Sequence, residues 1–284
     1  SYLSEWIDFH LKQGVQHFFL YDNNSNDGPR DILASYIDRG VVTLRFMGIP
    51  KEDGSQARAY QDCIEQDGQR SFWIAFIDID EFMFAVDSSL PHLLTQYERF
   101  GALFVHWQIF GSSGHKTRPI GSLLTNFTKR APTQWMRNRE GKSIVQPQLV
   151  ANLSRRTQKR LPHRFELSQG FYTVTEDKER IPEHPSWSAR VQATVKQLLG
   201  RRAAMLGTRL PFLFNPYGSI KAAPHRVKVS RIRIHHYIVR SKEEYSQKMS
   251  RMSSKPDKYN RHFFSYHDRN EVEDTILSSW NSSS

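Results

Sequence analysis

The chain has 284 residues, of which 38% are hydrophobic and 24% are charged. This balance excludes a wholly disordered protein, and the length allows one large domain or two small ones with a real core. No apolar run approaches the roughly 20 residues that a membrane-spanning helix needs. The single cysteine, Cys63, excludes a disulfide framework and argues against a cysteine-based zinc site.

The formal net charge is +11, and the basic residues are concentrated between Lys116 and Arg240. Such a surface attracts anions, although a simple solvated basic face is an equally weighted interpretation. The signatures of the common RNA-binding modules are missing, so we expect no nucleic-acid partner. We expect a cytoplasmic location with peripheral contact to anionic membrane, or a secretory-pathway lumen if an N-terminal anchor precedes this sequence.

The first hundred residues alternate between helix and strand patterns. Helices are predicted over 4–14, 29–40 and 54–68, and strands over 15–22, 41–47 and 72–80. This alternation predicts an α/β domain with a mostly parallel sheet, in which ligands bind at the carboxyl ends of the strands. The acidic clusters that include Asp22 and Asp80 both fall at such ends.

After residue 100 the pattern changes to strands separated by long polar segments. Strands are predicted over 102–110, 142–146, 170–174 and 231–239, the longest helical pattern covers 187–206, and a last helix covers 241–252. Ser241 and Glu244 form a capping box at the start of that last helix. With no repeat and no clean linker, we expect one domain over 1–284 with a variable insertion.

The stretch FWIAFIDIDEFMF, residues 72–84, places three carboxylates at the end of an apolar strand. Alternation on a strand would put Asp78 and Asp80 on the same side, where they repel unless a cation or proton separates them. Mn²⁺ or Mg²⁺ is the natural companion; a solvent-facing acidic turn is the alternative. Glu81 is a third ligand or, as we favour, a residue that orients its neighbours or bonds to backbone.

Three chemistries use such an acidic strand end. A haloacid-dehalogenase-type phosphatase would need Thr or Val where Phe82 stands, and a DEDD-type exonuclease would need further acids that do not stand out. The third is transfer from a nucleotide sugar, in which a metal bridges carboxylates and a diphosphate. A metal-dependent phosphate-ester hydrolase that uses the same carboxylates is kept as the alternative.

Four segments, in order between residues 2 and 252, resemble motifs of the family-92 glycosyltransferases and their bacterial relatives. They are YLSEWIDFHLKQGVQHFFLYDNNSNDG, WIAFIDIDEF, HWQIFGSSGH and IHHYIVRSKEEYSQKMSRM. The resemblance implies a GT-A fold, with a Rossmann-like nucleotide-binding half (1–100) and an acceptor-binding half (101–284). It also implies a UDP-sugar donor such as UDP-galactose, a glycan or other hydroxyl acceptor and a divalent metal, usually Mn²⁺. Family members carry a further strand before the first helix, so we expect this sequence to be N-terminally truncated.

The resemblance implies roles for residues of the donor side. Asp22 matches the acid that contacts the nucleotide base and Asn23 would join it in binding the nucleotide sugar, although both are equally typical of an Asx turn. Asp78 and Asp80 would bind the metal, which holds the donor diphosphate. His236 is the predicted third metal ligand, with a satisfied core histidine as the alternative.

Other residues are candidates for the leaving group, the acceptor and the base. Lys142 would offset the diphosphate charge, with a solvated surface lysine as the alternative, and Trp107 would stack on an acceptor sugar, with a core tryptophan as the alternative. The amides of the loop 111–115 would bind sugar hydroxyls or a phosphate. For inverting transfer a general base must deprotonate the acceptor, and His115 and Glu81 are the candidates.

Overall fold

The structure is a computed structural model, and it describes residues 2–25, 28–48, 55–151, 164–181, 226–251 and 261–280. The longest helical pattern of the sequence, 187–206, lies outside the described residues.

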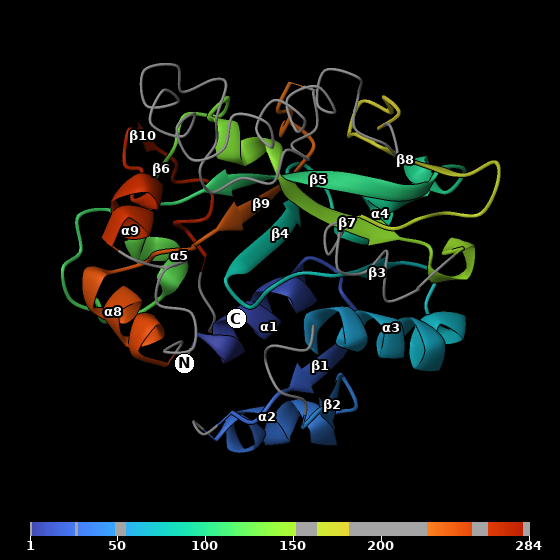
Figure 1. Ribbon diagram of the computed structural model, residues 1–284, viewed down its shortest axis with the longest axis horizontal. Helices are drawn as coiled ribbons and strands as arrows, with labels where there is room; N and C mark the ends of the chain where they lie inside the picture. The colour runs from blue at the N-terminus through green and yellow to red at the C-terminus, as the bar shows by residue number, and fades with distance from the viewer. Residues whose placement is uncertain are drawn as a thin grey trace, which may run out of the picture.

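The first elements form a small layer of parallel strands with a helical crossover (Figure 1). Strands β1 and β2 pair in parallel, with Phe18 opposite Val42 and Asp22 opposite Phe46, and helix α2 connects them. This strand–helix–strand unit confirms the alternation predicted from the sequence. The bounds are α1 (Leu3–Lys12), β1 (Phe18–Asp22), α2 (Pro29–Asp38), β2 (Val42–Phe46) and α3 (Ser55–Asp67).

A separate six-stranded sheet has the order β3-β7-β5-β9-β4, with β8 paired to β5. The pairs β3–β7, β5–β7 and β4–β9 are antiparallel, whereas β5–β9 and β5–β8 are parallel. The prediction of a mostly parallel sheet is therefore wrong here, because β3 and β4 of the first half pair antiparallel with β7 and β9, which come from beyond residue 100. Its strands are β3 (Ile74–Ala75), β4 (Glu81–Ala85), β5 (Gly101–Ile109), β7 (Gly141–Val145), β8 (Tyr172–Val174) and β9 (Ile232–His236).

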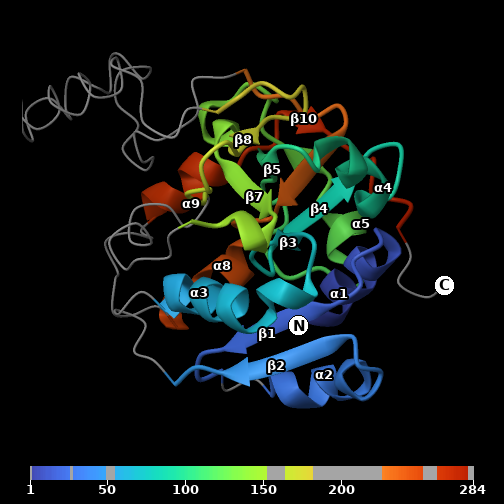
Figure 2. The same ribbon diagram turned by 90° about the vertical axis from the view of Figure 1, so that its right-hand side faces the viewer.

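The remaining elements surround this sheet (Figures 1 and 2). The helices are α4 (Leu90–Leu94), α5 (Leu123–Asn126), α8 (Lys242–Arg251) and α9 (Arg261–His267), with single turns of 3₁₀-helix at Gly68–Arg70, Thr95–Tyr97, Met136–Arg139 and Pro147–Leu149. Strands β6 (Lys129–Arg130) and β10 (Val272–Glu273) form a short antiparallel pair. Within the described ranges, no helix combines the length and the apolar character that crossing a membrane requires.

Helix α1 joins the two layers, lying between β4 and β1 (Figure 2). Its buried residues, Trp6, Ile7, Phe9 and His10, recur with helical periodicity and form one stripe. His10 bridges to the sheet: Nδ1–H donates to the carbonyl of Trp6 at 2.7 Å, and Nε2 accepts the amide of Met83 at 3.1 Å. These two hydrogen bonds fix α1 against β4. They therefore also fix the acidic segment that precedes β4.

Candidate functional site

The acidic segment Asp78–Glu81 is a turn between β3 and β4, and only Ile74–Ala75 of the preceding run is paired as a strand. The prediction that 72–80 form one strand is therefore wrong, and Ile79, between the two aspartates, is 58% exposed. The physical reason is local. The amide of Glu81 donates to the carbonyl of Asp78 at 3.0 Å, and the Glu81 carboxylate accepts the amide of Asp78 at 3.1 Å. These two bonds close a turn and take the segment out of the ladder.

Asp78 is paired with a buried lysine. Its Oδ2 lies 3.0 Å from Nζ of Lys142, and its Oδ1 accepts a hydrogen bond from Gln56 at 3.1 Å. Lys142 is fully buried in β7, and its Nζ also lies 3.8 Å from Oε1 of Glu81. Burial by itself would lower the pKa of Lys142, but Glu81 and Asp78 raise it above its ordinary value, so the ammonium stays charged. Lys142 thus places a buried positive charge next to the carboxylates of Asp78 and Glu81.

Asp80 is paired with a second lysine. Its Oδ2 lies 3.2 Å from Nζ of Lys248, and its Oδ1 lies 3.7 Å from Nε2 of His236. Burial would raise the pKa of Asp80, but the charge of Lys248 holds it below the usual range. Asp80 is therefore ionised at neutral pH.

Glu81 stabilises the turn Asp78–Glu81 through its hydrogen bonds. Its side chain is fully buried, its Oε2 accepts the Asp78 amide, and its own carbonyl accepts the indole N–H of Trp6 at 2.8 Å. Burial raises the pKa of its carboxyl well above the usual value, and Lys142 opposes this shift. The bond to the Asp78 amide agrees with the interpretation of Glu81 as a residue that bonds to backbone, and its role in orienting its neighbours stays a prediction.

His236 lies opposite Glu81 in the β4–β9 ladder and is almost completely buried. Burial lowers its pKa to about 4, so the imidazole is neutral at pH 7 and offers a lone pair. Its Nδ1 lies 3.9 Å from Oε1 of Glu81. Within the part of the chain that the structure describes, neither of these two buried atoms has a hydrogen-bond partner. The ring of His236 packs against that of Trp107 with 4.6 Å between centroids.

The three predicted metal ligands are only partly brought together. Asp80 and His236 converge, whereas Asp78 is drawn to Lys142. Over the described ranges, no group of three His, Cys, Asp or Glu side chains is arranged to hold a metal ion. Mg²⁺-like ions keep several waters and bind through one or two carboxylates together with substrate phosphates. One carboxylate and one neutral imidazole therefore fit an open divalent site, and they do not fit a closed cage.

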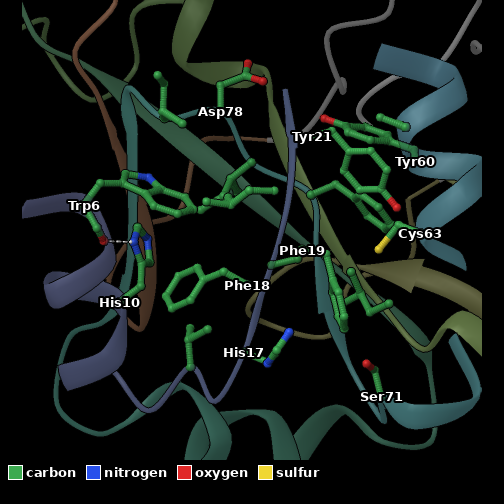
Figure 3. A pocket seen from close by; sticks show the side chains of 18 of the residues that line it. Trp6, His10, His17, Phe18, Phe19, Tyr21, Tyr60, Cys63, Ser71 and Asp78 are labelled. Carbon is green, nitrogen blue, oxygen red and sulfur yellow. Dashed lines mark hydrogen bonds between the residues drawn. The ribbon is translucent and has the colours of Figure 1, made fainter. Parts of the chain in front are cut away.

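A cavity of about 1010 Å³ lies next to this segment, between β1 and the run Ile74–Ile79 (Figure 3). Figure 3 shows Tyr21 and Asp78 at one end and His17 and Ser71 at the other. Among the described strands, β1 pairs only with β2 and β3 only with β7, so two strand edges border the cavity.

Asp22 and Asn23 line the same cavity as Asp78. The carboxylate of Asp22 accepts the amide of Ser25, three residues on, at 2.9 Å, so the side chain closes a local turn after β1, whereas an Asx turn would engage the residue two positions on. Its contact with a nucleotide base stays a prediction, and so does that of Asn23.

The loop 111–115 is held by the C-terminal segment 268–270. The amide of Ser112 donates to Asp268 and that of Ser113 donates to Asn270, both at 2.7 Å. The prediction that the loop amides bind a sugar or phosphate is therefore wrong for these two amides. No local signal in the sequence could reveal these partners, because they lie more than 150 positions away.

The remaining candidates from the sequence are His115 and Trp107, and both make contacts within the protein. His115 donates from Nε2 to the carbonyl of Asn126 at 3.0 Å, its ring packs on Phe127, and its own carbonyl accepts the amide of Lys242. Trp107, in β5, is 5% exposed. Catalysis by His115 and sugar stacking on Trp107 both stay predictions. Sequence reasoning missed Lys248, which comes from α8 and lies 168 positions from Asp80.

Comparison with known proteins agrees with the motifs. A sequence model of glycosyltransferase family 92 matches residues 1–181. A family-92 glycosyltransferase protein of Oryza sativa subsp. japonica is 34% identical over 51% of this chain and 25% of its own length. One from Ricinus communis is 26% identical over 72% of this chain and 36% of its own length, and one from Arabidopsis thaliana is 24% identical over 60% and 30%.

This chain thus spans between a quarter and about a third of the length of these curated relatives. The family match covers most of the chain, including the turn Asp78–Glu81, Lys142 and the loop 111–115. The chain belongs to glycosyltransferase family 92.

Proposed function

We propose that this protein transfers a hexose from a UDP-sugar to a hydroxyl acceptor, with inversion and with the help of Mn²⁺ or Mg²⁺. The observation that carries the proposal is the convergence of Asp80 and the neutral imidazole of His236 beside a cavity that Asp22 and Asp78 line. Family membership supports the reaction class and favours it over phosphate-ester hydrolysis.

The nucleotide of the donor would lie at the end of the cavity where β1 finishes. Asp22 ends β1 and Asp78 follows β3, and both residues line this cavity. Among the described residues, the side chain of Asp22 accepts the amide of Ser25 through Oδ1, so Oδ2 would be offered to the nucleotide. Asn23 would contribute next to it.

Asp80 and His236 would hold the divalent ion, and Asp78, with a side chain 45% exposed, would add a carboxylate from the solvent side. When bound, the ion would neutralise the diphosphate as it leaves the sugar. Burial keeps His236 unprotonated at pH 7, so its lone pair does not have to be released from a proton. The ion pair with Lys142, 3.0 Å from Oδ2, would hold the carboxylate of Asp78 in place.

The acceptor hydroxyl must lose a proton as it attacks the anomeric carbon. Glu81 is enclosed, and its Oε2 is engaged by the Asp78 amide, which supports a positioning role for it. His115 remains the other candidate for the base.

The test is donor turnover and binding by the wild type and by Asp80→Asn, with the exposed Asp87→Asn as a matched control. UDP-galactose and UDP-glucose are supplied with Mn²⁺, and release of UDP is measured together with binding of UDP by calorimetry. We expect Asp80→Asn to lose Mn²⁺-dependent UDP binding and turnover, whereas Asp87→Asn keeps both. Full turnover by Asp80→Asn, or hydrolysis of p-nitrophenyl phosphate by a protein that does not bind UDP, would refute the proposal.

A further inference from the structure

Lys248 occupies the place of a cation on the carboxylate that would bind the divalent ion. Its Nζ lies 3.2 Å from Oδ2 of Asp80, and the imidazole of His236 faces Oδ1 of the same carboxylate. Both oxygens of Asp80 are therefore directed at nitrogen atoms. An ion that binds Asp80 would have to share this carboxylate with the ammonium or displace it.

The two lysines of the acidic segment differ in their freedom to move. Lys142 is 0% exposed and contacts both Asp78 and Glu81. The side chain of Lys248 is 37% exposed, while that of Asp80 is 11% exposed. The side chain of Lys248 thus keeps contact with solvent, and its long flexible stem would allow the ammonium to leave Asp80 without a change of backbone.

Helix α8 is fixed at its start, so motion of Lys248 would be confined to its side chain. The capping box is complete: the Ser241 amide donates to the Glu244 carboxylate at 3.3 Å, and Ser241 Oγ accepts the Glu244 amide at 3.2 Å. The amide of Glu243 donates to the carbonyl of Lys116, and the Glu243 carboxylate accepts the amide of Arg118 at 2.8 Å. Lys248 follows Glu244 by one helical turn.

Charge determines where the displaced ammonium would go. A divalent ion on Asp80 would repel an ammonium about 3 Å from the same carboxylate, and in a partly buried site this repulsion is only weakly screened. The diphosphate of the donor, bound to the same ion, would be the nearest new anion, and Lys is a common phosphate-binding residue.

We propose that Lys248 neutralises Asp80 in the donor-free protein and moves to the donor diphosphate when a divalent ion binds Asp80. This inference rests on the proposed function, because it names a further donor-binding residue of the same site. Lys248 would then have two opposite effects. It would weaken binding of the divalent ion when no nucleotide is present, and it would strengthen binding of the nucleotide once the ion is bound.

The experiment measures Mn²⁺ binding without any nucleotide, from the electron paramagnetic resonance signal of the free ion. The proteins are the wild type, Lys248→Met and the control Lys242→Met, which changes an exposed lysine of the same helix. We expect Lys248→Met to bind Mn²⁺ roughly threefold to tenfold more tightly, because the competing ion pair is lost. At saturating Mn²⁺ the same variant should bind UDP more weakly by a similar factor, whereas Lys242→Met should match the wild type in both assays.

The outcomes separate this inference from the proposed function. If the wild type binds Mn²⁺ and UDP and Lys248→Met binds Mn²⁺ no more tightly, the inference is overturned and the proposed function stands. Tighter Mn²⁺ binding with unchanged UDP binding overturns the transfer to the diphosphate. If no variant binds Mn²⁺ or UDP, both fail. Circular dichroism of each variant shows that it is folded.

Discussion

The ammonium nitrogen of Lys142 lies 3.0 Å from Oδ2 of Asp78, although Lys142 is completely buried and Asp78 is nearly half exposed. Strand β7 places this lysine next to the acidic turn. Lys142 lies opposite Val105 in the ladder between β7 and β5, and this pairing fixes its position. The carboxylates that seemed to need a metal therefore already have a cation of the protein itself.

Replacing Lys142 by Met should destabilise the protein by about 3–5 kcal/mol, because one partner of a buried charged pair is removed. Equilibrium unfolding in urea would measure this loss, with the exposed Lys129→Met as a control. The double variant Lys142→Met/Glu81→Gln should be more stable than Lys142→Met alone, since it leaves no buried carboxylate without a cation. Equal stability of Lys142→Met and Lys129→Met would contradict the role of Lys142.

Glu5 caps helix α5 from a distant part of the chain. Its carboxylate accepts the hydroxyl of Ser122 and the amides of Leu123, at 2.9 Å, and Leu124, at 3.2 Å. Glu5→Ala should lower the free energy of unfolding by about 1–2 kcal/mol, because orphan helix amides lose their acceptor. The melting temperature reports this change, and the exposed Glu65→Ala should shift it much less. A wild-type melting temperature for Glu5→Ala would show that the cap is dispensable.

His10 should make the protein sensitive to mild acid. Burial lowers its pKa from 6.5 to about 4, so the unfolded chain binds a proton in this range before the folded protein does. The stability linked to this histidine is therefore complete above about pH 6.5 and is lost as the pH falls toward 4. Urea unfolding between pH 7.5 and 4.5 should show a shallower decline for His10→Gln than for the wild type. The exposed His92→Gln should keep the wild-type slope, and identical slopes for all three would count against this account.

Gly111 has no space for a side chain. A Cβ built there would lie 2.3 Å from the carbonyl oxygen of Arg269, whereas one at Gly68 would lie 3.3 Å from the Cβ of Pro147. Gly111→Ala should therefore cost roughly 1–3 kcal/mol and separate the loop 111–115 from the segment 268–270. Hydrogen exchange of the Ser112 and Ser113 amides, which that segment accepts, should accelerate. Gly68→Ala serves as the milder control, and unchanged exchange in Gly111→Ala would contradict this packing.

Local features of the fold could be predicted from the sequence because their causes are local. The stripe Trp6–His10 defined α1, the apolar runs before Asp22 and after Gly40 defined β1 and β2, and Ser241 with Glu244 defined the start of α8. The order of strands in the large sheet could not be predicted. The antiparallel pairing of β4 with β9 joins residues about 150 positions apart, and its direction depends on packing that no periodicity records.

The same division applies to the candidate site. The sequence by itself determined that three carboxylates stand together at 78–81, that a late histidine accompanies them, and that the motifs are those of family 92. Only the tertiary structure decided which cations neutralise those carboxylates. Lys142 and Lys248 come from β7 and α8, and they reach the acidic turn because a buried charge is stable only beside an opposite one.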